Sequence, residues 1–144
     1  MNAENTRKLY EKYPRLYAQH KLGPEQSNMC FGFECGDGWY SIIDALSQVI
    51  SALDLDAEAY QVKEKFGGLR FYCDNDGMPR MVGAILMAEA MSDRTCEVCG
   101  TTENVTQNDG GWITTRCEAC RGDDERPVAR GNWISKFFRS LWEV

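Results

Sequence analysis

The 144-residue sequence lacks most of the groups on which enzymes depend. It contains one histidine, His20, so Ser-His-Asp or Cys-His catalysis would need this single residue. His20 lies at a predicted helix end, where a histidine caps more often than it catalyses. The chain has no glycine-rich phosphate loop followed by Lys-Ser or Lys-Thr, and an acid site would require Glu34, Asp37 and Glu64 to converge. We therefore expect a protein that is not an enzyme.

Long apolar stretches and an excess of basic charge are also missing. No run approaches the roughly 20 apolar residues that cross a bilayer, and the first eight residues lack the apolar segment of a signal peptide. We expect a cytoplasmic protein. The net charge of −6 argues against generic nucleic-acid binding. The hydrophobic fraction of 43% is that of a folded domain, so a real core is expected.

Seven cysteines are present, and four of them form two Cys-x-x-Cys pairs separated by seventeen residues. Each pair can bind a metal ion from a tight turn, and two pairs complete the tetrahedron that zinc prefers. We expect one zinc ion, with a pair of disulfides or unrelated cysteines as the alternatives. The ion would be structural, because four sulfur ligands leave no position for water or substrate. A reducing compartment favours the metal. The predicted ligands are Cys96, Cys99, Cys117 and Cys120.

Hydrophobic periodicity before the cysteine pairs predicts an α+β fold. Apolar residues recur at helical spacing from Trp39 to Leu53, with Asp37 as the expected cap, and again from Pro79 to about Asp93. Two shorter helical pieces are expected before Gln19, broken near Pro14. The alternation from Cys30 to Cys35 predicts a strand with Phe31, Phe33 and Cys35 on its buried side.

A β-hairpin is predicted around Gly67-Gly68, in a small antiparallel sheet with that strand. If Phe66 faces Leu69, one face is core and the other is basic. Glu64 falls on the core face, so an edge position that reaches solvent is expected for it, with a functional acid as the alternative. The core face carries Tyr60, Val62, Glu64, Phe66, Leu69, Phe71 and Cys73. The basic face carries Gln61 and four candidate ligand-binding residues, Lys63, Lys65, Arg70 and Tyr72.

This basic face is a candidate site for a nucleotide or a nucleic acid. Its cationic side chains would contact phosphates while Tyr72 stacks on a base. An ordinary solvated sheet face is the alternative interpretation.

The chain after Gly131 predicts an amphipathic helix. The last nineteen residues carry four basic and one acidic side chain, whereas the preceding residues carry twelve basic and twenty-one acidic ones. An aromatic stripe of this kind is typical of a protein interface. Packing on the protein's own body, a homodimer contact and a membrane surface are the alternatives, although the helix is short and modestly basic for a membrane. The stripe contains Trp133, Ile134, Phe137, Phe138, Leu141 and Trp142.

These elements predict three parts. Residues 1–94 form an α+β domain built on two main helices and the small sheet, residues 95–122 form a four-cysteine zinc ribbon or knuckle, and residues 123–144 form a linker and the C-terminal amphipathic helix.

Three stretches together resemble a group of small, functionally uncharacterised zinc-ribbon proteins encoded by bacteriophages and prophages. They are the Gly-Asp-Gly-Trp-Tyr motif at 36–40, Val-Lys-Glu-Lys-Phe-Gly-Gly-Leu-Arg-Phe-Tyr at 62–72, and the cysteine pattern at 96–120. The resemblance covers roughly residues 35–120. It implies a phage setting and a zinc-containing α+β fold, and it carries over no catalytic residue. By analogy, it favours a protein that binds and modulates a host protein, including one of host defence.

Overall fold

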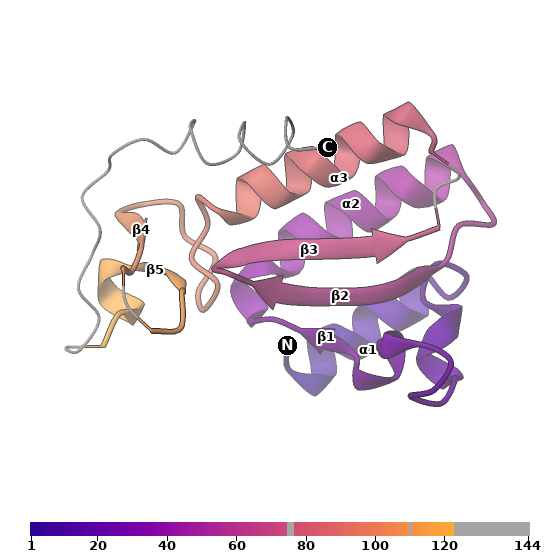
Figure 1. Ribbon diagram of the computed structural model, residues 1–144, viewed down its shortest axis with the longest axis horizontal. Coiled ribbons are helices and arrows are strands. Elements are labelled where there is room, and N and C mark those ends of the chain that lie inside the picture. Colours follow the sequence, from indigo (N-terminus) through magenta and orange to yellow (C-terminus); the bar gives the residue numbers. More distant parts are fainter. Residues whose placement is uncertain (75–76, 110, 123–144) are drawn as a thin grey trace.

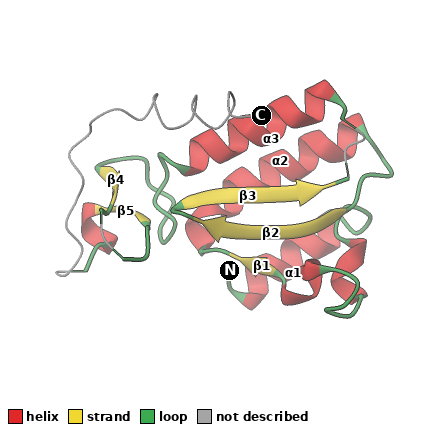
Figure 2. Cartoon of the chain, in the orientation of Figure 1, coloured by secondary structure: helices red, strands yellow, loops and turns green. Residues whose placement is uncertain are grey.

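The computed structural model describes residues 1–74, 77–109 and 111–122. Within these ranges the chain has the predicted mixed α+β fold, with three α-helices and two small sheets (Figure 2). The helices are α1 (Ala3–Lys12), α2 (Tyr40–Leu53) and α3 (Pro79–Ser92), the larger sheet contains β1 (Phe33–Glu34), β2 (Ala59–Lys65) and β3 (Gly68–Cys73), and the smaller sheet contains β4 (Val105–Gln107) and β5 (Thr115–Cys117). The predicted linker and amphipathic helix at 123–144 lie outside the described residues.

The larger sheet has the strand order β1-β2-β3, and Figure 1 shows the helices on one side of it. β2 and β3 form the predicted antiparallel hairpin, whereas β1 pairs with β2 in parallel. The prediction of an antiparallel sheet throughout was therefore wrong for β1. The parallel pairing follows from the connection between the two strands, because it contains α2 and is long enough to return the chain to the same end of the sheet.

The strand predicted over residues 30–35 is limited to β1. Phe33 and Cys35 are buried as predicted, but Phe31 is 61% exposed. It ends a 3₁₀ turn and is followed by Gly32, whose φ of +73° redirects the chain. Burial raises the pKa of the Cys35 thiol to about 12, as expected for an inert cysteine.

Asp37, the residue predicted to cap α2, forms hydrogen bonds with the start of α1 instead. No side chain caps α2, which begins after Trp39. The Asp37 carboxylate accepts hydrogen bonds from the Asn2 backbone N–H and from Asn5 Nδ2, both at 2.9 Å. The Asn2 N–H lowers the Asp37 pKa. α1 ends two residues before Pro14, in agreement with the prediction.

The β2–β3 hairpin turns at Phe66 and Gly67, one residue earlier than predicted. Lys65 pairs with Gly68, and both turn residues have positive φ, +54° at Phe66 and +77° at Gly67. Glu64 faces Leu69 where the predicted register placed it opposite Phe71. Because this partner moves by two positions, the residues keep their predicted sides of the sheet.

Two residues of the predicted core face are nevertheless exposed. Phe66 lies in the turn, and Tyr60 lies at a register shift of β2 and is 42% exposed. Ala59 is buried in the place of Tyr60. The remaining apolar residues of the face are buried as predicted, namely Val62, Leu69, Phe71 and Cys73.

The hydrophobic core lies between the sheet and the helices. Trp39 is fully buried, which confirms its prediction as a core residue. α3 packs along the outer edge of β3, where the Ser92 hydroxyl accepts the Leu69 N–H at 2.9 Å and the Glu89 carboxylate accepts the Phe71 N–H at 3.4 Å. These bonds satisfy strand groups that would otherwise offer a free sheet edge.

Candidate metal centre

The four predicted metal ligands lie together at the end of the chain's second sheet. Their Sγ atoms are all within 4.8 Å of one another, and those of Cys99 and Cys117 are 3.7 Å apart. Four thiolates around a tetrahedral ion at about 2.3 Å would be about 3.8 Å apart. The donor set therefore fits one metal ion. Among the residues that the structure describes, this is the one group of at least three potential metal ligands.

The first cysteine pair sits in a turn whose backbone favours ionised sulfur. Gly100 adopts a φ of +79°, and its N–H donates to the Cys96 carbonyl at 2.9 Å. Burial disfavours the Cys96 thiolate, but the N–H groups of Cys117, Cys99 and Val98 outweigh it and lower its pKa to about 7.

The second cysteine pair shows why a cation belongs at this centre. Hydrogen bonds from the Cys120 thiol to the sulfurs of Cys117 and Cys99 raise the pKa of Cys120 to about 12, because they favour its protonated form. A divalent ion would supply the positive charge that lets four sulfurs ionise together.

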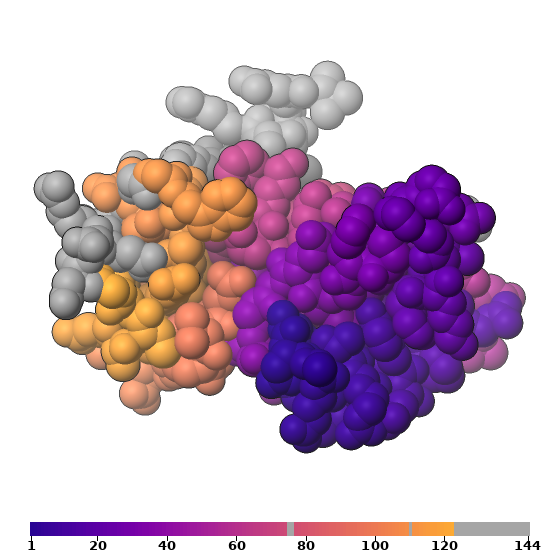
Figure 3. Space-filling model, turned by 90° about the horizontal axis from the view of Figure 1, so that it is seen from below, coloured from indigo at the N-terminus to yellow at the C-terminus, as the bar shows by residue number. Residues whose placement is uncertain are grey.

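The metal module, residues 95–122, is held against the body of the protein at the Gly36–Gly38 segment. The Gly38 N–H donates to the Glu97 carbonyl at 2.7 Å, and the Gly36 N–H donates to the Glu97 carboxylate at 2.9 Å. A Cβ on Gly38 would stand 2.0 Å from the Cys96 carbonyl oxygen. The indole N–H of Trp39 donates to the Thr95 carbonyl at 2.9 Å. Figure 3 shows the module, in orange and yellow, seated directly on the body.

A second attachment is formed at the tip of the β2–β3 hairpin. The Gly67 carbonyl accepts hydrogen bonds from the Thr115 hydroxyl and from Gln107 Nε2. A Cβ on Gly67 would lie 2.8 Å from Ile113 Cγ2. The Glu64 carboxylate accepts the Gly67 N–H at 2.6 Å, so Glu64 closes the hairpin turn from the strand end. Both glycine motifs noted in the sequence are thus docking points for the metal module.

The four candidate residues on the basic hairpin face do not form one cluster. Lys63 Nζ lies 6.0 Å from the Tyr72 ring centroid, and this ring stacks on Tyr60. Arg70 turns toward α3, where it lies 3.9 Å from a Glu89 oxygen. The fourth candidate, Lys65, lies over the Phe66 ring at the hairpin tip. The structure therefore places Lys63 beside Tyr72 and opposite Arg70 in the strand register, whereas Lys65 lies apart from them.

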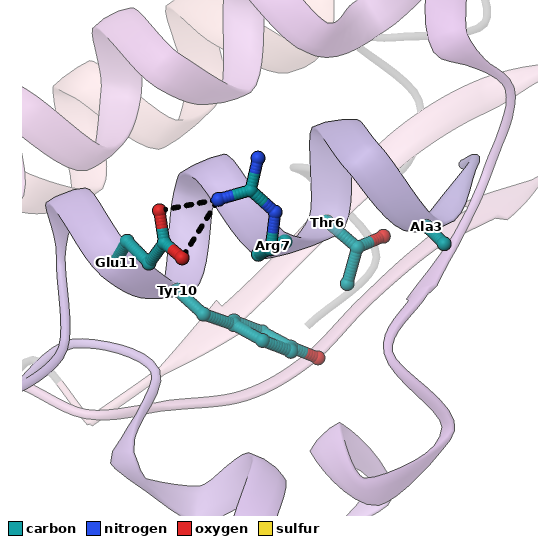
Figure 4. A pocket seen from close by; sticks show the side chains of 5 residues that line it. All are labelled: Ala3, Thr6, Arg7, Tyr10 and Glu11. Carbon is teal, nitrogen blue, oxygen red and sulfur yellow. Dashed lines mark hydrogen bonds and ion pairs between the residues drawn. The ribbon is translucent and has the colours of Figure 1, made fainter.

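Two hollows on the described surface lie away from the four-cysteine centre. The larger, about 380 Å³, lies over α1 and is lined by residues that include Tyr10 and the ion-paired Arg7 and Glu11 (Figure 4). His20, the single histidine, stacks on Tyr10 with ring centroids 4.0 Å apart, and its Nδ1 lies 2.7 Å from the Tyr17 carbonyl oxygen. The smaller hollow, about 220 Å³, lies between β3 and α3.

Sequence reasoning missed two exposed aromatic residues beside the metal module. Phe66 is 70% exposed, although the sequence placed it on the core face of the hairpin, and Trp112 is 75% exposed. Their neighbours Gly67 and Ile113 are in contact, which links the hairpin tip with the module. Phe66 and Trp112 are called the aromatic tip below. The partner-binding stripe predicted in the tail lies outside the described residues.

Comparison with protein-family models, with curated proteins and with solved structures found no match to this chain. None of the described helices has the length and apolar character to cross a membrane. Function must therefore be argued from the geometry of the site.

Proposed function

We propose that this chain is a non-enzymatic interaction protein whose four-cysteine centre holds one structural zinc ion. Zinc suits a compact set of four thiolates better than oxygen-preferring ions such as magnesium or calcium. A complete sulfur shell leaves no coordination position for a substrate, so the ion would hold the module on the body.

The conformation of Phe66 carries the proposal of protein binding. Phe66 occupies the first position of a two-residue hairpin turn at a φ of +54°, where Asn or Gly is preferred. This conformation costs a bulky side chain about 1 kcal/mol. Burial of the ring offsets little of this cost, because the Phe66 side chain is 70% exposed in the folded chain. A residue that is costly for folding and exposed to solvent is best explained by a partner that buries it.

Trp112 supplies a second large aromatic group at the same end of the molecule. Both residues flank the contact between Gly67 and Ile113, so the hairpin and the metal module present them on a fixed frame. Rigid aromatic side chains are typical anchors of protein interfaces. The resemblance to phage-encoded proteins makes a host protein, including one of host defence, the partner to seek.

The aromatic tip can be tested without damaging the fold. Phe66→Asn fits the turn better, so it should raise stability by about 0.5–1 kcal/mol while weakening partner capture from host cells. Trp112→Ser should weaken capture as well. Leu55→Ser is the matched control. Leu55 is 77% exposed and lies in the loop between α2 and β2, at the end of β2 that is far from the aromatic tip. If neither tip variant affects partner capture, the aromatic tip is excluded as the binding surface. For the metal centre, elemental analysis should find one zinc ion per chain.

The pairing of Lys63 with Tyr72 favours a second candidate, a nucleotide or nucleic-acid site on the outer face of the sheet. A cation beside a stacking ring is the combination that single-strand binders use. Titration of oligonucleotides and nucleotides into the wild type and a Lys63→Ser, Tyr72→Leu variant tests it. Equal binding by the two proteins, or none by either, rejects this candidate.

A further inference from the structure

The outward side of α3 is an exposed apolar face. It includes Val82 and Leu86, each 39% exposed, Met87 at 67% and Met91 at 50%. The opposite side of the helix packs on α2 and β3. From Val82 to Met91 the face extends for about 14 Å along the helix. Four large apolar side chains exposed on one helix of an acidic protein indicate a surface that is covered by another segment or by a partner.

A groove continues this face toward the sheet. The hollow of about 220 Å³ between β3 and α3 is lined by Tyr60 and Tyr72 on one side and by Val82 and Leu86 on the other, with Glu89 also in its wall. Small-molecule pockets begin at roughly 300 Å³. The groove therefore suits one large side chain from a segment lying along α3 better than it suits a metabolite.

We propose that the chain's own residues 131–144 cover the α3 face and fill this groove. The apolar stripe of this segment, from Trp133 to Trp142, would extend about 14 Å as a helix, the same length as the α3 face. Charge favours the same occupant, because residues 131–144 carry a net +1 and the rest of the chain carries −7. This inference is independent of the aromatic tip.

The metal module lies close enough to α3 for the segment to reach the apolar face. Figure 1 shows the module at one end of α3, which is the Ser92 end because the chain passes from Ser92 directly into the module. The last described residue, Gly122, belongs to the module. The ten residues from 123 to 132 can span about 33 Å, whereas α3 is about 21 Å long. The segment can therefore reach every part of the α3 face from the module.

The length of the connection also distinguishes this occupant from a second copy of the chain. A segment tethered by a short linker meets its own α3 at an effective concentration in the millimolar range. A second copy would cover the face only in proportion to protein concentration. The two arrangements therefore differ in their response to dilution.

Methionine-methyl NMR of the full-length, metal-loaded protein tests the proposal. The methyl groups of Met87 and Met91 should show nuclear Overhauser effects to tryptophan ring protons, and these should persist on dilution and be absent between differently labelled chains in a mixed sample. A Phe137→Ser, Trp142→Ser variant should lose the effects and oxidise faster at Met87 in peroxide, whereas Lys136→Ser should behave as wild type. Effects that arise only between chains, or methionines that contact no aromatic ring, would overturn the proposal.

Discussion

Gly38 lies so close to the first cysteine pair that replacing it with alanine tests how the metal module is held. The new Cβ would stand 2.0 Å from the Cys96 carbonyl oxygen and 2.6 Å from the Glu97 oxygen and the Gly100 nitrogen. Contacts under 3.0 Å essentially never occur for a Cβ, and all three of these atoms belong to the backbone. The two segments must therefore separate by about 1 Å, since no flexible side chain can move aside instead.

The energetic effect follows from this separation. The hydrogen bond from the Gly38 N–H to the Glu97 carbonyl, 2.7 Å long, would be lost. Loss of this hydrogen bond between partly buried residues costs about 0.5–1.5 kcal/mol, and the strain of overpacking adds about 1–3 kcal/mol. We expect a destabilisation of about 2–4 kcal/mol in the metal-loaded protein. Because seating of the module and metal binding are linked, a loss of 2 kcal/mol corresponds to a roughly thirty-fold weaker metal affinity.

Denaturant unfolding and competition with a chelator measure the two quantities. Gly83→Ala is the matched control, because Gly83 lies inside α3 with nothing within 4 Å of its Cβ position. This substitution should stabilise the protein by about 0.5–1 kcal/mol and leave metal affinity unchanged. The reasoning is refuted if Gly38→Ala keeps wild-type metal affinity, or if it destabilises the metal-free protein as much as the metal-loaded one.

Three further outcomes are expected. Burial raises the Asp93 pKa to about 6 and Arg70 opposes this shift, so ionisation of Asp93 destabilises the fold as the pH rises from 4 to 6. Asp93→Asn should therefore stabilise the protein by about 1–2 kcal/mol at pH 7, after allowance for solvent screening, and should have no effect on stability below pH 4. Equal gains in stability at both pH values would contradict this. Chelation or Cys99→Ser should release one metal ion per chain and speed hydrogen exchange across residues 96–120 while α2 stays protected, so unchanged exchange would count against a structural metal. Thr115→Val removes the hydroxyl that donates to the Gly67 carbonyl and should cost about 1–2 kcal/mol in thermal unfolding, whereas an unaffected melting temperature would show that the hairpin tip does not hold the module.

The long helices and the metal ligands were predictable because their signals are local. α2 and α3 follow from runs of apolar residues at helical spacing, and the break before Pro14 follows from the missing proline N–H. The cluster of four cysteines was predictable because two Cys-x-x-Cys pairs at this spacing are typical of a metal site.

Contacts between distant segments were not predictable in this way. Asp37 precedes α2 in the sequence and resembles a cap, but Asn2 and Asn5 of α1 reach its carboxylate first. The two turn residues of the hairpin are Phe66 and Gly67. A turn at Gly67-Gly68 would have had the lower conformational free-energy cost, because glycine adopts positive φ without strain. With this turn, the Gly67 carbonyl lies against Thr115, a contact that exists only once the metal module is in place.

The sequence by itself determined the element types, the faces of the hairpin and the set of four cysteines that could hold a metal ion, because spacing and residue chemistry set these over a few residues. Tertiary structure alone decided what the glycine motifs do. Gly36, Gly38 and Gly67 occur in turns and could be explained by turn geometry, yet a Cβ at each of them would collide with the metal module. Close approach between segments some thirty to sixty residues apart depends on how the whole chain packs, which local pattern does not encode.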